Sequence, residues 1–367
     1  MENRKIRVAI THGDINGVGY EVILKTFSNP EMLGLCTPVI YGSPKVAIYH
    51  RNAIGLQENF NVVNSAKDAR DNQINLVNCF GEEEIKIEFG KATPEGGKAA
   101  YVSLETALKD IAAGFVDVLV TAPINKNTIQ RDGFHFPGHT EYIEQKLGKG
   151  QKALMILMNE NIRVALVTTH VPVAKIAQSI TQPLLEEKLQ ILNQSLKRDF
   201  SIDNPRIAVL SLNPHCGDDG LIGEEEKTII NPVVENCFKQ GIRCFGPYAA
   251  DGFFGSGNYK HFDAILAMYH DQGLAPFKAL AMDDGVNYTA GLPIVRTSPA
   301  HGTAYDIAGK NEANEASFRQ AVYTAIDVFR NRAKYDEAFG NPLRKQYYEK
   351  RDDSDKLKLD QVTEDDI

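Results

Sequence analysis

Short apolar runs alternate with longer amphipathic stretches along most of this chain. Runs at 6–11, 37–41 and 116–121 each lead into a turn and then into a helical pattern. Repeated strand–loop–helix units predict a largely parallel sheet covered by helices. By the same pattern we expect a helix near 20–27 and another from about Asn125. Residues 59–88 contain short alternating segments, which predict antiparallel strands.

Three further apolar runs share one property, which is that each ends in a histidine. They are 162–170, 207–215 and 262–270, ending in His170, His215 and His270. A buried parallel strand reads as a near-continuous apolar run, and open α/β sheets bind ligands beyond the carboxyl ends of their strands. Three imidazoles are a suitable ligand set for one catalytic divalent metal. The alternative is that each histidine caps its strand and bonds to backbone, but the repeated position favours a metal site.

Composition restricts the class of protein. The chain has 367 residues, 43% hydrophobic and 24% charged, enough for two lobes or one large α/β domain. The net charge of −8, with no basic stretch interleaved with aromatics, argues against a nucleic-acid partner. None of the five cysteines forms a C-x-x-C pair, no run reaches the ~20 apolar residues that span a bilayer, and no signal-peptide pattern follows Met1. We therefore expect a cytoplasmic protein without a membrane partner.

Two segments contain residues suited to an anionic ligand. Lys278, Asn287 and Arg296 follow His270 in a region rich in Gly and Pro, and two cations with an amide between them suit a phosphate or a carboxylate. The alternative for these cations is a solvated surface. His139 and Thr140 stand at an expected helix start, where they could donate to an anion or, in the case of Thr140, simply cap the helix.

Two loops are candidates for a larger ligand. The glycines of the 11–21 turn allow close backbone approach, but their spacing is not the dinucleotide-binding fingerprint, so a ligand loop and a structural turn remain equal alternatives. The 298–309 segment is rich in small residues and lightly charged. Such a loop lets a planar group lie against backbone, although its composition alone indicates only a loop.

Taken in order, these segments resemble the 4-hydroxythreonine-4-phosphate dehydrogenase family, the PdxA family of pyridoxine biosynthesis. The stretch from Tyr269 to Lys278 is the most specific part of the match. The 301–309 segment also resembles the cofactor loop of isopropylmalate and isocitrate dehydrogenases. The other matching stretches are Gly13-Asp14 with Gly17 and Gly19, Thr121 to Lys126, Gly138 to Glu141, Thr169-His170, Leu212 to His215, and Arg296 to Ser298.

The resemblance implies a three-layer α/β/α fold with two lobes and mostly parallel sheets, like isopropylmalate dehydrogenase. We expect a cofactor-side lobe from 1–128 plus 285–340 and a metal- and dimer-side lobe from 129–284. Residues 341–367 differ in composition, being highly charged with few large apolar groups, and are expected to form a charged C-terminal tail.

The resemblance also implies an activity: NAD(P)-dependent, metal-dependent oxidation of 4-phosphooxy-L-threonine at C3, followed by decarboxylation. It implies a homodimer with a shared active site and one divalent ion, zinc, magnesium or cobalt, at the three histidines. Lys278 and Asp251 are the expected catalytic groups, with Asp251 as proton acceptor. The substrate contacts would be His139, Thr140, Lys278, Asn287 and Arg296, and the cofactor contacts His301, Gly302, Thr303, Ala304 and Asp306.

The sequence departs from the family pattern at 14–21 and at 249–252. The second departure surrounds Asp251, so the substrate could instead be D-threonate or D-erythronate 4-phosphate. Two other classes remain open. A metal-dependent hydrolase of a phosphorylated metabolite would need the histidines and the cations but not the 301–309 loop. A non-catalytic sensor of a phosphorylated metabolite would bind without turnover.

Overall fold

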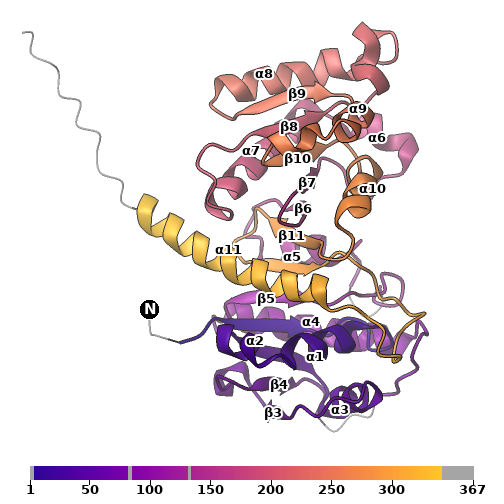
Figure 1. Cartoon of the computed structure of the whole chain (residues 1–367), viewed down its shortest axis with the longest axis vertical. Coiled ribbons are helices and arrows are strands. Elements are labelled where there is room, and N and C mark those ends of the chain that lie inside the picture. Colours follow the sequence, from indigo (N-terminus) through magenta and orange to yellow (C-terminus); the bar gives the residue numbers. More distant parts are fainter. Residues whose placement is uncertain (1–3, 82–84, 131–133, 341–367) are drawn as a thin grey trace, which may run out of the picture.

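The computed structural model describes residues 4–81, 85–130 and 134–340. Helices cover both faces of one twelve-stranded sheet, in the strand order β3-β4-β2-β1-β5-β12-β11-β6-β7-β10-β8-β9 (Figure 1). The predicted three-layer, mostly parallel α/β/α architecture is confirmed. The expected charged tail at 341–367 lies outside the described residues, and the predicted lobe boundaries stay a prediction.

The first half of the sheet is parallel throughout. Its strands are β1 (Arg7–Thr11), β2 (Thr37–Gly42), β3 (Phe60–Val63), β4 (Ile74–Asn78) and β5 (Val118–Thr121). The antiparallel strands expected in 59–88 are therefore a wrong prediction, because β3 and β4 pair in parallel. The connection between them contains a 3₁₀ turn (Ala66–Asp68) and brings the chain back to start β4 in the same direction. Alternating polarity identifies a strand but not its direction.

The helix expected from Asn125 is also wrong. Residues 126–130 form a turn, and the next helix is α5 (His139–Leu147). The side-chain Oδ1 of Asn125 accepts hydrogen bonds from the backbone N–H groups of Asn127 and Thr128, at 3.0 and 3.1 Å. An asparagine that bonds to nearby backbone in this way competes with the helical pattern.

The second half of the sheet contains the three runs that end in histidine. Its parallel strands are β7 (Arg163–Leu166), β8 (Ile207–Leu210), β9 (Cys244–Tyr248) and β10 (Ala264–Ala267). The two halves are joined by β6 (Leu154–Met158), β11 (Val286–Ala290) and β12 (Arg296–Pro299), where β11 is antiparallel to both neighbours. β7, β10 and β8 are adjacent, so the three histidines follow neighbouring strands at the same edge.

The helices form two layers, as the alternation along β1 shows. Val8 and Ile10 belong to one core cluster and Ala9 to another, because successive side chains of a strand point to opposite faces. The first face is covered by α1 (Gly19–Phe27), α2 (Pro30–Leu35), α3 (Pro44–Ala53), α6 (Ile176–Ser179), α7 (Gln182–Arg198), α8 (Asn231–Lys239) and α11 (Ala316–Gly340). The second is covered by α4 (Pro94–Ala112), α5, α9 (Ala250–Gly255) and α10 (His270–Ala281). No helix in the described part of the chain is long and apolar enough to cross a membrane.

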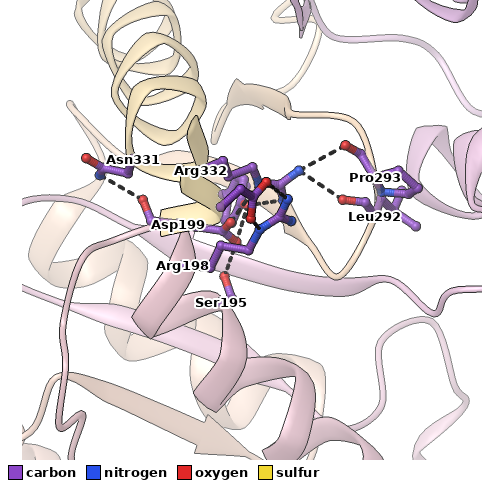
Figure 2. Close-up of polar contacts among 9 residues, drawn as sticks. Ser195, Arg198, Asp199, Leu292, Pro293, Asn331 and Arg332 are labelled. Atoms are coloured by element: carbon purple, nitrogen blue, oxygen red, sulfur yellow. Dashed lines mark hydrogen bonds and ion pairs between the residues drawn. The ribbon is translucent and has the colours of Figure 1, made fainter. Parts of the chain in front are cut away.

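A buried ion pair fixes the junction of the two halves (Figure 2). Arg332 of α11 lies 2.7 Å from Asp199 at the end of α7, with both side chains under a tenth exposed. Asp199 also accepts hydrogen bonds from the hydroxyls of Ser195 and Tyr288, each at 2.6 Å. Arg332 donates in addition to the backbone carbonyls of Leu292 and Pro293. This cluster ties α7 and α11 to β11 and to the turn that follows it.

We predict that Asp199→Ala lowers the free energy of unfolding by about 3–5 kcal/mol, because it leaves the Arg332 guanidinium buried without its counter-ion. The matched control is Arg198→Ala. Arg198 pairs with Asp336 at 2.6 Å on the surface, where such pairs contribute about 1 kcal/mol or less. Urea denaturation of both variants checks the difference. Equal losses of stability would show that burial of the Asp199 pair does not determine its contribution.

Two buried histidines pack beside the turn after β1. The ring of His12 stacks on Tyr20 at 5.0 Å between centroids, and His50 lies against the same tyrosine at 4.9 Å. His50 Nε2 lies 2.8 Å from the carbonyl oxygen of Ile15. Burial lowers the pKa of His12 to about 4 and that of His50 to about 3. Both rings are therefore neutral in the folded protein at neutral pH.

These pKa shifts predict a loss of stability in mild acid. Below about pH 6.5 the unfolded chain protonates these histidines while the folded chain does not, so the unfolded state binds more protons and stability falls down to about pH 4. His50→Gln keeps an amide donor for the carbonyl oxygen of Ile15. It should reduce the slope of the free energy of unfolding against pH by up to about 1.4 kcal/mol per pH unit. Denaturation at several pH values between 7 and 5 measures it, with the exposed His261→Gln as control. Parallel curves for His50→Gln and the wild type would refute the assignment.

Candidate active site

A cavity of about 240 Å³ lies where the two halves of the sheet meet. It is bounded by the loop after β5, the start of α5, the loop after β7, the helix α10 and the strands β11 and β12. Most of the residues predicted to form the site lie on its wall. They are His139, Thr140, His170, His270, Lys278, Asn287, Arg296, His301 and Gly302.

The floor of the cavity contains a buried cation. Arg296 is 2% exposed and donates to the hydroxyl of Thr121, at 2.7 and 3.1 Å, and to that of Thr289, at 3.2 Å. Burial lowers the pKa of Arg296 to about 10, with Glu141 acting in the opposite direction. The guanidinium therefore keeps its charge at neutral pH, and its only described side-chain bonds are to neutral hydroxyls. Its charge remains available to an anionic ligand.

Four buried polar atoms of the cavity wall lack a hydrogen-bond partner among the described residues. They are Oδ1 of Asn287 on β11, Nε2 of His139 at the start of α5, Oε2 of Glu141 and Nε2 of His301. Burial, and then the nearby cations Arg296 and Lys126, hold the pKa of His139 well below its usual range. An unsatisfied buried polar group costs about 1–3 kcal/mol, so a polar ligand that paired with these atoms would bind more tightly.

Two helices begin at the cavity without a side-chain cap. The N-cap of α5 is Gly138 and that of α10 is Tyr269, and neither N-cap residue makes a side-chain capping hydrogen bond. Thr140 is therefore not the cap of α5, which was the alternative to a ligand contact. The free N–H groups and the positive end of the helix dipole favour an anion at such a position. Lys278, farther along α10, adds a second cation to the wall.

His170 and His270 both have Nδ1 beside a carboxylate, which directs Nε2 of each ring away from it. Nδ1 of His270 lies 2.6 Å from Asp271 Oδ1. His170 has Nδ1 3.5 Å from Glu141 Oε1, and Nε2 2.9 Å from Lys126 Nζ. An ammonium group can only donate, so Nε2 of His170 carries the lone pair and the proton faces the carboxylate. A carboxylate behind Nδ1 is the usual arrangement for a metal-binding histidine, and the two ring centroids are 6.2 Å apart.

His215 and Asp251 lie in a neighbouring cavity of about 550 Å³, lined also by Tyr269 and Gln272. Among the residues that the structure describes, no three His, Cys, Asp or Glu side chains are placed to hold one metal ion. The structure thus brings all three histidines to one edge of the sheet, but only two of them to one cavity of a single chain. The donor set itself, three imidazoles on adjacent strand ends, fits a divalent metal.

The backbone around His215 is unusual. Residues 215–219 all have positive φ, from 46 to 77°, and only Gly217 adopts this conformation without strain. The buried carboxylate of Glu226 stabilises the preceding turn by accepting from the backbone N–H groups of Leu212 and Asn213, at 2.8 and 2.7 Å. Strained backbone of this kind is concentrated at functional sites.

The predicted cofactor loop packs against the N-terminal glycine turn. The carbonyl of Thr303 accepts from the N–H of Val18 at 3.0 Å, and a Cβ at Gly17 would stand 2.6 Å from that oxygen. The hydroxyl of Tyr305 donates to Asp14 Oδ2 at 2.8 Å. The glycine turn therefore supports the loop. His301 and Gly302 reach the cavity, Thr303 and Ala304 are half-buried beside it, and Asp306 is exposed.

Lys126, Glu141 and Thr121 had no predicted role, although all three occur in the segments that carried the resemblance. They line the cavity and contact His170 or Arg296. A polar residue at the end of an apolar strand, as at Thr121, was the available signal. The contact of Lys126 with His170 joins residues far apart in the chain and has no local pattern.

Comparison with known proteins identifies the family. Residues 34–325 match the profile of the family described as pyridoxal phosphate biosynthetic protein PdxA. The chain belongs to the PdxA family. It is 68% identical, over the full length of both chains, to a Bacteroides thetaiotaomicron protein named 4-hydroxythreonine-4-phosphate dehydrogenase. The family resemblance inferred from the motifs is thus confirmed.

Two further relatives are a solved structure with the same fold and a protein with a different name. The crystal structure of 4-hydroxythreonine-4-phosphate dehydrogenase from Klebsiella pneumoniae superposes with a TM-score of 0.76 at 30% identity, covering 89% of this chain and 99% of that one. A protein of Oceanobacillus iheyensis, 35% identical over 89% of this chain and 98% of its own, is provisionally named a D-threonate 4-phosphate dehydrogenase.

Proposed function

We propose that this PdxA-family protein oxidises 4-phosphooxy-L-threonine at C3, with NAD or NADP as oxidant. The product, 2-amino-3-oxo-4-phosphooxybutanoate, is a β-keto acid that loses CO2 to give 3-amino-2-oxopropyl phosphate. One observation carries the proposal: a single cavity joins an anion-binding wall, two histidines oriented for a metal, and the 301–302 loop. The name of the 68% identical relative supports it.

The substrate's phosphate and carboxylate would bind to the cationic wall. Lys278 and Arg296 supply positive charge, and the free N–H groups at the start of α5 supply donors. Asn287 and Thr140 would add neutral hydrogen bonds. His139, whose lowered pKa keeps it uncharged, would pair with a hydroxyl group.

His170, His215 and His270 would hold the metal, which could be zinc, magnesium or cobalt because imidazole binds several such ions. When bound, the metal would polarise the C3 alcohol and the nicotinamide would accept hydride. The chain's own contribution is to hold and move protons. The carboxylates of Asp271 and Glu141 keep the ligand rings in the correct tautomer, and Asp251 would take the hydroxyl proton.

The proposed site needs a homodimer, since His215 and Asp251 lie in a second cavity of the same chain. Two apolar side chains support such an interface. Val173 follows His170 and Leu221 follows His215, and each is 84% exposed. A second chain packed against both histidine loops would remove these two side chains from water. The cofactor would bind to the loop formed by His301, Gly302, Thr303, Ala304 and Asp306.

A turnover panel tests the reaction and its substrate. 4-Phosphooxy-L-threonine, D-threonate 4-phosphate and D-erythronate 4-phosphate are each supplied with NAD or NADP and a divalent metal. We expect reduced-nicotinamide absorbance to rise fastest with the first compound. A faster rate with either tetronate phosphate would favour the alternative, which the Oceanobacillus relative supports. Phosphate release without cofactor reduction would indicate a hydrolase, and binding without turnover a sensor.

The metal assignment predicts the behaviour of His215→Ala. This variant should lose bound metal and metal-dependent turnover but keep its fold, because His215 is exposed and contributes no core packing. Elemental analysis of the dialysed protein and circular dichroism check both parts. The control is His261→Ala, another exposed histidine. Unchanged metal content and rate in His215→Ala would remove His215 from the site.

A further inference from the structure

The three strands that precede the histidines are connected beyond the end of the sheet. The ladder between β10 and β8 pairs Leu266 with Val209 as its last partners. On the other side of β10, backbone bonds continue as far as Thr168, whose N–H donates to the carbonyl of Met268 at 3.2 Å. The strand ends nearest the histidines would therefore separate between β10 and β8 unless another group joined them.

The side chain of Gln272 makes that connection. Its Oε1 accepts from the N–H of Met268 at 2.8 Å, and its Nε2 donates to the carbonyl of Ser211 at 2.6 Å. Met268 directly follows β10 and Ser211 directly follows β8. A carboxamide has the donor and acceptor of a peptide group, so Gln272 continues the ladder with one side chain.

Both backbone polar groups of Met268 are hydrogen-bonded to neighbouring segments. While Gln272 binds its N–H, Thr168 binds its carbonyl oxygen with both backbone N–H and hydroxyl, the latter at 2.8 Å. Met268 is fully buried and stands two residues before His270. Thr168 stands two residues before His170, and Ser211 four before His215. The hydrogen-bonded chain Thr168–Met268–Gln272–Ser211 thus crosses all three strands close to their histidines.

We propose that Gln272 is a positioning residue of the metal site. Its carboxamide holds the strand ends that carry His270 and His215, which line two different cavities of the chain and would serve the two shared sites of the dimer. Thr168 sets the separation of His170 and His270, which line the same cavity. The inference rests on the proposed function, because the metal site is part of it. Residues that hydrogen-bond directly to metal ligands typically change metal affinity by about 10–100-fold when substituted. Gln272 acts through the backbone of Met268 and Ser211, so its effect should lie at the lower end of that range.

Titration of the full-length protein with Co²⁺ tests this proposal, because its absorption spectrum reports coordination as well as affinity. Gln272→Met keeps the side-chain length and removes both hydrogen bonds. We expect its Co²⁺ affinity to fall by about 10-fold and the spectrum to change. Gln272→Glu keeps the acceptor for Met268 but replaces the donor toward Ser211, and should also bind weakly. The control, Gln190→Met, alters an exposed glutamine of α7 and should bind as the wild type does.

Thr168→Val provides a second variant should Gln272→Met fail to fold. It removes the hydroxyl bond and keeps the backbone bond to Met268, so a smaller loss of Co²⁺ affinity is expected. Folded Gln272 variants with wild-type affinity and spectrum would overturn the proposal and leave the proposed function intact. A wild-type protein that binds no Co²⁺ would overturn the metal site and, with it, the role of Gln272.

Discussion

The reversal of strand direction in the middle of the sheet is the constraint on which the site depends. β5 runs parallel to β12, β11 runs antiparallel to both β12 and β6, and β7 runs antiparallel to β6. The two halves of the sheet therefore run in opposite directions, and the loops after β5 and β7 approach the cavity from opposite ends of the central strands. Lys126 and His170, which are 44 residues apart in the sequence, meet there. The site thus depends on strand direction as well as on particular side chains.

The antiparallel strand β11 supplies the other wall. It joins the two halves of the sheet and is anchored behind by the buried pair of Asp199 and Arg332, through the hydroxyl of Tyr288. A pair of this kind contributes little net stability compared with apolar packing, but it is costly to break and holds its neighbours in one arrangement. The cavity thus lies on one face of β11, and its fixed support lies on the other.

Much of the fold and part of the site could be predicted from the sequence. Apolar runs predicted the strands β7, β8 and β10. The histidine at the end of each run predicted which ends of these strands carry residues of the site. The direction of β3 relative to β4 was not predictable, since alternation is the same for both senses. Nor was the turn at Asn125, where a side chain that bonds to local backbone overrides the helical pattern.

The sequence also did not predict that His215 would lie apart from the other two histidines. His215 begins a run of five successive residues with positive φ, a conformation that no local pattern of residue types predicts. The contacts of Glu141 and Lys126 with His170 join segments that the sheet brings together, so no local spacing encodes them.

Because side chains alternate between the two faces of β11, the length of the turn that follows this strand matters for the cavity. Asn287 faces the cavity, while Tyr288 faces the buried ion pair, and both are fixed by the register in which β11 pairs with β6 and β12. A shift by one residue would exchange them, putting a phenol where the amide stands and leaving Asp199 without the hydroxyl of Tyr288. Arg332 holds the 291–295 turn by donating to the carbonyls of Leu292 and Pro293. The number of residues in this turn therefore determines the chemistry of the cavity as much as any residue on its wall.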